Sequence, residues 1–372
     1  MPNLKSINSN KGPRTWALIF LGPLSRLYML GFALVRRWRQ LRGGATGYPF
    51  KIISVGNLTV GGTGKSVVVR FLAELLGPKR CAIVLRGYRG SNERTGQSLL
   101  VSDGEHLFAG PDVAGDEAIM HAAALPARVV VGADRKKSCD LLAVPIKFAI
   151  LDDAYQNFAV KKDLEILLLD ARAPLDNGWC LPAGRLRERD TSRADLIILT
   201  HANEVAPDRL QELVATYLDH KKEHVIMGKH EPAGVFLYND QFLLLPSDLA
   251  NTPLLLCAGV GSFAGVRATA RASGLMIAGE HAFNNHHNYT STDLDYLRQQ
   301  LKVTGCQAVL TTEKDWVKFA PLVLEKNARI FRDALRVPQG ERALKIYVLR
   351  VAFACMMPED HERLCEHIAV LS

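Results

Sequence analysis

Short apolar runs alternate with stretches of helical pattern between residues 50 and 200. The runs with the composition of β-strands are 50–55, 81–85, 128–131, 147–151, 165–169 and 196–199. Strands that alternate with helices are typical of a largely parallel sheet covered by helices, in which ligands bind at the carboxyl ends of the strands. The pattern therefore predicts an α/β fold with helices on both faces of its sheet.

The pattern changes near residue 225. A strand at 225–227 is followed by a hairpin over 234–246 that turns at Asn239-Asp240, and then by a strand and glycine turn at 254–261, a helix at 265–273 and a strand at 308–310. We therefore predict an N-terminal tail and helix at 1–45, a main domain at 46–225 and a smaller α/β domain at 226–372 that closes over the site.

The N-terminal segment combines a polar tail, predicted to be mobile over 1–13, with a strongly apolar stretch at 16–35. Arg26 near the centre of that stretch would be costly inside a bilayer, so spanning is disfavoured. After Pro23, a good residue for a first helical turn, apolar side chains share one helical face. They are Leu24, Leu27, Tyr28, Leu34, Val35, Trp38 and Leu41. This predicts an amphipathic helix in the membrane interface.

Two alternatives compete for this segment. A signal peptide is disfavoured because no convincing small-residue cleavage site follows the apolar stretch. A helix that packs on its own domain stays open, because amphipathicity does not identify the apolar partner.

The distribution of charge along the chain favours a membrane surface over nucleic acid as the partner. The net charge is +8, yet no acidic residue precedes Glu74, so the basic excess is entirely N-terminal. Nucleic-acid proteins more often spread basic residues over a recognition face with interleaved aromatics, whereas an anionic lipid surface suits a basic terminal segment. The 7 cysteines are scattered and odd in number, which indicates a reducing compartment.

A phosphate-binding loop follows the strand at 50–55. The segment Thr59-Val60-Gly61-Gly62-Thr63-Gly64-Lys65-Ser66 leads into a helix. Glycines let backbone N–H groups converge on phosphate oxygens, the lysine can reach the β- and γ-phosphates, and the serine hydroxyl can ligate Mg²⁺. The pattern predicts a P-loop, with Thr59 where the common motif has glycine.

Two adjacent carboxylates, Asp152 and Asp153, end the strand at 147–151, and Gln156 follows. P-loop enzymes hold Mg²⁺ or its waters with carboxylates in this position. A polar strand end or helix cap is the alternative, but two carboxylates would repel each other there unless a cation relieves them.

Other polar motifs are ambiguous on their own. Asp116 could cap the helix that follows it, and the histidines at 286–287 lack further ligands at zinc spacing. Arginines at 86, 135, 185 and 187 follow strands or turns, where their cations could meet phosphate groups.

Taken in order, these motifs resemble the tetraacyldisaccharide 4'-kinase family, the lipid A 4'-kinases of Gram-negative bacteria. The resemblance covers the chain from the N-terminal helix to about Lys318. It rests on the segments 56–66, 86–88, 115–117, 152–156, 176–178 with 181–184, 186–188 and 311–315. Thr59 at the start of the P-loop is itself typical of that family.

The resemblance implies a peripheral enzyme at the cytoplasmic face of the inner membrane. It would move the γ-phosphoryl group of ATP, with Mg²⁺, to the 4'-hydroxyl of an acylated glucosamine disaccharide 1-phosphate, with no obligate protein partner. It implies Asp116 as general base with His286 as its partner, and Lys65 neutralising charge. It assigns metal contacts to Ser66, Asp152, Asp153 and Gln156. Tyr88, Arg187 and Glu188 would line the nucleotide site beside the P-loop residues 59–66.

Some positions depart from the family pattern. Asn285 stands where aspartate is usual, Asn157 where histidine often follows the glutamine, Arg185 where proline is frequent, and Ser262-Phe263 where Asn-Pro is usual. Two other functions are compatible with these motifs: a membrane-associated P-loop ATPase or GTPase switch, and a P-loop kinase for a soluble small molecule. Guanine specificity is disfavoured because residues 200–203 lack the guanine signature. A kinase for a soluble molecule would keep its activity without residues 14–42.

Overall fold

The computed structural model describes residues 15–42, 45–142, 145–237, 243–323 and 344–371. Contacts divide the chain into two compact units. The first unit comprises Met1–Arg86, Asp134–His230 and Phe353–Ser372, and the second comprises Gly87–Ala133 and Glu231–Ala352. The predicted tail at 1–13 and the side chain of Leu41 lie outside the described part.

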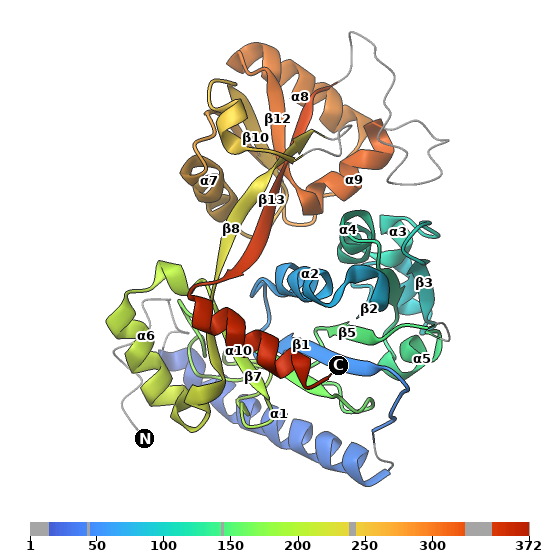
Figure 1. Ribbon diagram of the computed structural model, residues 1–372. Helices are drawn as coiled ribbons and strands as arrows, with labels where there is room; N and C mark the ends of the chain where they lie inside the picture. The colour runs from blue at the N-terminus through green and yellow to red at the C-terminus, as the bar shows by residue number, and fades with distance from the viewer. Residues whose placement is uncertain (1–14, 43–44, 143–144, 238–242, 324–343, 372) are drawn as a thin grey trace. The chain divides into compact units, whose positions relative to one another are not determined.

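The first unit is built on a parallel sheet in the order β8-β7-β6-β1-β5-β2 (Figure 1). Its strands are β1 (Lys51–Asn57), β2 (Cys81–Leu85), β5 (Phe148–Asp152), β6 (Leu164–Asp170), β7 (Leu196–Thr200) and β8 (Val225–Leu237). Val55 of β1 pairs with Asp152 of β5, so the P-loop and the double aspartate leave the same edge of the sheet. This confirms the predicted parallel α/β fold.

Helices cover both faces of this sheet, which explains why its strands are apolar along their whole length. They are α1 (Thr15–Arg42), α2 (Lys65–Leu76), α5 (Arg135–Asp140), α6 (Pro207–Leu213) and α10 (Pro358–Ala369). The ring of Phe71 in α2 lies 6.3 Å from that of His361 in α10, so these two helices are neighbours. Leu210 and Leu213 of α6 instead join the cluster that contains Leu167 of β6.

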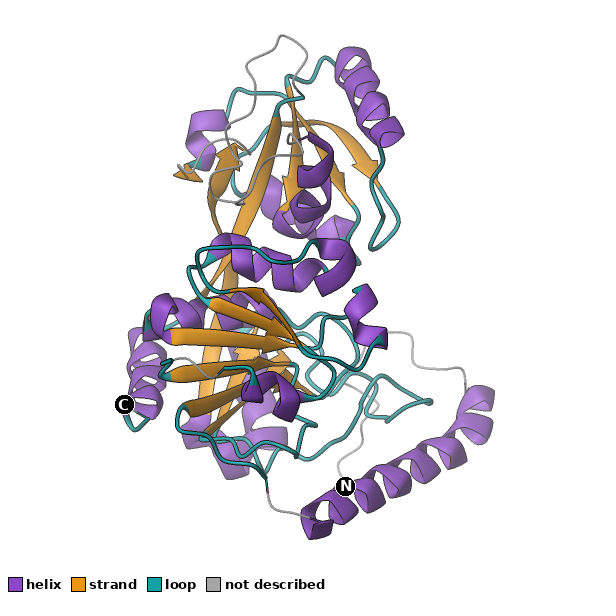
Figure 2. Cartoon of the chain, turned by 90° about the vertical axis from the view of Figure 1, so that its right-hand side faces the viewer, coloured by secondary structure: helices purple, strands orange, loops and turns teal. Residues whose placement is uncertain are grey.

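Helix α1 is the long helix at the lower right of Figure 2. It packs on the first unit through one face, and the side chains of its apolar face are exposed. Ser25 is buried and its hydroxyl donates to the Cys180 carbonyl at 2.8 Å, while Tyr28 contacts the core cluster. The exposed apolar side chains are Ile19, Phe20, Leu24, Leu27, Met29, Leu30, Leu34, Val35 and Trp38. By length and composition, Ile19–Trp38 could cross a membrane. Its contacts with the unit instead fit a helix that lies on the protein with one side uncovered.

The second unit has its own parallel arrangement, β11-β10-β12-β13, and a separate antiparallel pair, β3-β4 (Figure 1). Its strands are β3 (Leu99–Ser102), β4 (Arg128–Val131), β9 (Leu243–Leu244), β10 (Leu254–Ala258), β11 (Ile277–Ala282), β12 (Ala308–Thr312) and β13 (Ile346–Cys355). Its helices are α3 (Pro111–Ala114), α4 (Asp116–Ala124), α7 (Phe263–Ala272), α8 (Ser291–Thr304) and α9 (Glu313–Val323). Strands β8 and β13 run from one unit into the other.

The units differ from the predicted domains in three segments, of which the shortest, 226–230, lies in the first unit. Residues 87–133 lie in the second unit and residues 353–372 in the first, although sequence order suggested the opposite. The predicted hairpin is present, since β8 pairs with β9 through Val235 and Leu244. Its turn at Asn239-Asp240 lies outside the described residues.

Candidate active site

The P-loop of the first unit is shaped by close approaches of other side chains and backbone. A Cβ atom at Gly56 would lie 2.6 Å from the Tyr155 backbone nitrogen, so only glycine lets β1 end against this segment. Gly64 has φ +77° and lies directly against the ring of His230. Arg185 donates to the Val60 carbonyl at 2.7 and 3.0 Å, and its own carbonyl accepts the Val60 N–H at 2.8 Å.

The loop ends in a pattern suited to phosphate. Helix α2 begins at Lys65 with Ser66 in its first turn, so the positive end of its dipole faces the loop of Thr59, Gly61, Gly62 and Thr63. The Thr63 hydroxyl is buried and has no hydrogen-bond partner among the described residues. A buried donor of this kind fits an anionic oxygen.

Lys65 is held above the end of β1. Its Nζ atom lies 3.3 Å from the Asn57 Oδ1 atom and 3.4 Å from the Asp153 Oδ1 atom. Burial would raise the pKa of Asp153, but the charges of Lys65 and Arg187 outweigh it and lower that pKa. Asp153 is therefore ionised at neutral pH, and it positions the lysine.

Arg187, Gln156 and Glu188 continue this network. Arg187 Nη1 donates to both Asp153 oxygens at 3.0 Å and lies 3.2 Å from the Gln156 Oε1 atom. The Gln156 amide donates to the Asn57 carbonyl at 2.9 Å and to Glu188 at 3.0 Å. In this structure Gln156 thus connects two charged side chains, and the role in metal binding expected for it stays a prediction.

Oxygen donors that suit Mg²⁺ gather here. Asp152 is buried, and its carbonyl accepts from the buried Arg135 at 2.9 Å. Within the described ranges no group of three or more His, Cys, Asp or Glu side chains is arranged to hold a metal. Ser66, Asp152 and Asp153 fit Mg²⁺ in another way, since this ion keeps waters and phosphate oxygens beside one or two carboxylates.

A second cluster, in the second unit, surrounds Asp116. This residue opens α4, whose N-cap is Gly115 with no side-chain cap bond, so capping does not account for the carboxylate. Its Oδ2 atom lies 3.0 Å from Lys318 Nζ of α9 and 3.5 Å from His286 Nδ1, in the loop after β11. Three segments of the second unit therefore meet at one carboxylate.

His286 is held in an unusual conformation within this cluster. Its φ is +61° and its N–H donates to the Gly259 carbonyl at 2.8 Å, which turns the ring toward Asp116. Burial and the nearby Lys314 and Arg89 lower the pKa of His286, so the ring is neutral near pH 7. The ring of Tyr88 lies 6.4 Å away, edge to face.

Comparison with known proteins identifies the family to which the chain belongs. Residues 17–352 match the family described as "Tetraacyldisaccharide-1-P 4'-kinase". The chain belongs to the tetraacyldisaccharide-1-P 4'-kinase family. This confirms the family predicted from the motifs, and with it the class of kinases that have a hydroxyl acceptor.

Individual relatives agree with the family assignment. The chain is 36% identical over 326 residues to the tetraacyldisaccharide 4'-kinase of Pelobacter propionicus, covering 84% of this chain and 86% of that one. It is 36% identical over 314 residues to the enzyme of Geobacter metallireducens, covering 78% and 87%. The crystal structure of an "apo" form of LpxK from Aquifex aeolicus in complex with ATP superposes with a TM-score of 0.71 and 26% identity, covering 95% of this chain and 98% of that one.

The structure adds residues to this family site that the motifs did not single out. Arg193 binds Glu188 through two bonds, at 2.8 and 3.1 Å, and Lys318 binds Asp116. Glu188 and Asp116 stand in segments that the motifs included, but their partners Arg193 and Lys318 do not, so only the fold reveals these contacts. Tyr88, expected beside the nucleotide, lies in the second unit with His286.

Proposed function

We propose that this protein transfers the γ-phosphoryl group of ATP to the 4'-hydroxyl of tetraacyldisaccharide 1-phosphate, with Asp116 as the general base. The hydroxyl proton passes to the Asp116 carboxylate, and the hydroxyl oxygen forms a bond to the γ-phosphorus. The bond from that phosphorus to the β–γ bridging oxygen breaks, and ADP leaves. The observation that carries the proposal is a P-loop lysine held between Asn57 and Asp153 in a chain of this family.

The first unit would bind ATP. Backbone N–H groups of 61–66 and the Thr63 hydroxyl would face phosphate oxygens, and Lys65 would compensate the charge that develops on the transferred group. Bound Mg²⁺, held by Ser66 with Asp152 and Asp153, would neutralise phosphate charge and orient the chain of phosphates.

The second unit would activate the acceptor. Lys318 and His286 fix the orientation of the Asp116 carboxylate, and a neutral His286 adds no second positive charge against it. A carboxylate needs only modest basicity in phosphoryl transfer, because positioning and charge stabilisation provide most of the rate.

Helix α1 would attach the enzyme peripherally to the cytoplasmic face of the inner membrane. Its exposed leucines and Trp38 suit the acyl boundary, and the basic N-terminal segment suits anionic headgroups. An acylated substrate stays in that surface, so the helix brings the enzyme to it.

The test is to incubate purified protein with Mg²⁺-ATP and tetraacyldisaccharide 1-phosphate in detergent micelles and to follow lipid phosphorylation. Transfer to the 4' position is expected. A folded protein that binds ATP without phosphorylating the lipid would contradict the proposal.

A further inference from the structure

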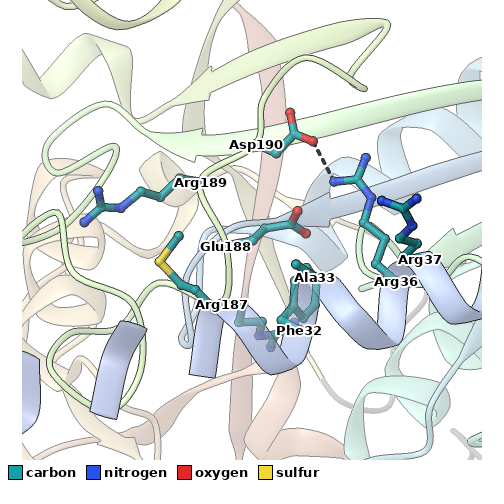
Figure 3. A pocket seen from close by; sticks show the side chains of 9 residues that line it. Phe32, Ala33, Arg36, Arg37, Arg187, Glu188, Arg189 and Asp190 are labelled. Carbon is teal, nitrogen blue, oxygen red and sulfur yellow. Dashed lines mark hydrogen bonds and ion pairs between the residues drawn. The ribbon is translucent and has the colours of Figure 1, made fainter. Parts of the chain in front are cut away.

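Helix α1 is connected to the first unit by an ion pair as well as by packing. Arg36 Nη1 lies 2.8 Å from the Asp190 Oδ2 atom, and the two side chains border a pocket of about 670 Å³ between α1 and residues 187–190 (Figure 3). Arg37 lines the same pocket, but within the described residues it has no ion-pair partner. Neighbouring arginines of equal charge thus differ in one contact.

Asp190 is connected to Glu188 through Arg193. Arg193 Nη1 lies 3.2 Å from the same Asp190 oxygen and donates to Glu188 at 2.8 Å, while its guanidinium stacks 4.2 Å above the Tyr155 ring. The Tyr155 hydroxyl in turn donates to the Asp190 carbonyl at 2.7 Å. Asp190 is therefore fixed from two sides, and its carboxylate helps to orient the guanidinium that holds Glu188.

Glu188 connects this cluster to the P-loop lysine. Gln156 donates to Glu188 at 3.0 Å, and its Oε1 atom accepts from Arg187 at 3.2 Å. Arg187 binds Asp153, which lies 3.4 Å from Lys65. A continuous series of charged and hydrogen-bonded groups thus runs from α1 to the proposed nucleotide site, within the first unit alone.

The opposite face of α1 carries its exposed leucines. A helix that uses one face for an ion pair with the protein and the other for lipid is ordered by both partners. If a lipid surface covers the exposed face, it restrains α1 and so keeps Arg36 at Asp190.

We propose that Arg36 is a positioning residue, which couples the lipid-facing helix to Glu188 and Lys65 through Asp190 and Arg193. The inference rests on the proposed function, and it adds that α1 supports turnover as well as attachment. Arg36 has no contact with substrate in this scheme. It acts through the orientation of Glu188.

The experiment compares Arg36→Gln with Arg37→Gln, which removes the same charge from the next position of the same helix. Steady-state kinetics with saturating Mg²⁺-ATP and lipid in micelles give kcat and KM separately, and sedimentation with anionic phospholipid vesicles gives attachment. We expect Arg36→Gln to lower kcat about fivefold, as for the loss of a partly exposed ion pair. Arg37→Gln should keep kcat, both variants should attach to vesicles equally, and Arg36→Lys should recover most of the loss.

Hydrogen exchange of residues 153–156 and 187–193 provides a readout that does not depend on turnover. Exchange should become faster in Arg36→Gln only. Equal kcat and equal exchange in the two glutamine variants would overturn the inference while leaving the proposed function intact. Absence of transfer in the unaltered protein would overturn both.

Discussion

Asp116 combines two kinds of neighbour that have different consequences for catalysis. Lys318 is almost fully buried and compensates the charge of the carboxylate, while His286 approaches with a neutral ring. A carboxylate held in this way has one defined orientation, which is what a base for a hydroxyl proton requires.

The first prediction concerns Asp116→Asn, which keeps the shape of the side chain and removes its charge. We expect kcat for lipid phosphorylation to fall by about a hundredfold or more, because an amide cannot accept the proton. ATP binding should persist, since the P-loop belongs to the first unit. Asp112→Asn, an exposed carboxylate in the same unit, is the control. Normal turnover in Asp116→Asn would remove the base assignment.

The ring of His230 packs directly against the P-loop at Gly64. A Cβ atom at Gly64 would lie 2.1 Å from its ring, and its Nδ1 atom lies 3.1 Å from the His201 Nε2 atom. Burial and the neighbouring His201 lower the pKa of His230 to about 4. The folded protein therefore keeps this ring neutral.

A pH dependence of stability follows. Above about pH 6.5 the ring is neutral in both the folded and the unfolded chain, so it does not lower the free energy of unfolding. As the pH falls toward 4, the unfolded chain takes up the proton first, and by pH 5 about 2 kcal/mol of the free energy of unfolding should be lost. His230→Gln should show a correspondingly smaller decrease between pH 7 and pH 5 in urea unfolding. If the pH dependence in that variant equals that of the unaltered protein, the lowered pKa of His230 is contradicted.

Residues near strand ends could be predicted because their chemistry is local. The sequence correctly placed Lys65 at the start of the helix after the P-loop and Asp152 at the end of a strand, since the loop and the carboxylates directly follow apolar runs. Lys318 and His230 could not be predicted, because they act through contacts with residues far away in the chain. Arg193 binds Glu188 and Asp190 close by in the chain, but no motif distinguishes it from the neighbouring arginines.

At the scale of elements, α1 shows how one helix serves two environments. Its apolar positions predicted one lipid-facing side, and Leu24, Leu27, Leu34, Val35 and Trp38 are exposed. Tyr28, predicted on the same side, instead packs against the core cluster, so its placement was wrong. The side chain of Leu41 lies outside the described residues. The packing face is made by Gly22, Ser25 and Tyr28, which lie three positions apart and leave no strong apolar signal. Small and hydroxyl-bearing residues let α1 approach the first unit closely without being apolar. The pattern of apolar positions therefore did not reveal this contact.

Replacing Leu27, Leu30 and Leu34 together by glutamine should separate these two roles. We expect affinity for anionic vesicles to fall at least about tenfold, because exposed apolar surface is what enters the lipid boundary. Circular dichroism and melting temperature should change little, since these side chains do not contact the core. Val303→Gln, at an exposed apolar residue of the second unit, should bind vesicles as before. Undiminished attachment of the triple variant would refute the role of this face.

At the scale of the whole molecule, the chain passes between the two units four times along its length. Periodicity indicated the strands and helices but gave no sign that residues 87–133 and 353–372 would change units. The boundary between the units depends on which elements pack together. The local pattern of apolar and polar residues does not indicate these packing partners.

Strand β13 should therefore stabilise different units at different positions. Phe353 is buried against Phe71 in the first unit, and Ile346 is buried in the core of the second. Each change to alanine should cost about 3 kcal/mol of local stability. Hydrogen exchange should become faster in β1, β6 and β7 for Phe353→Ala, and in β10 and β12 for Ile346→Ala. Identical exchange profiles would show that the units do not unfold separately.

The discontinuity of the first unit also affects how the protein folds during synthesis. Because α10 belongs to the first unit, that unit stays incomplete while residues 231–352 of the second unit are synthesised, and it is completed only when α10 follows. A stop codon just before α10 would thus leave the second unit whole and remove a helix from the first.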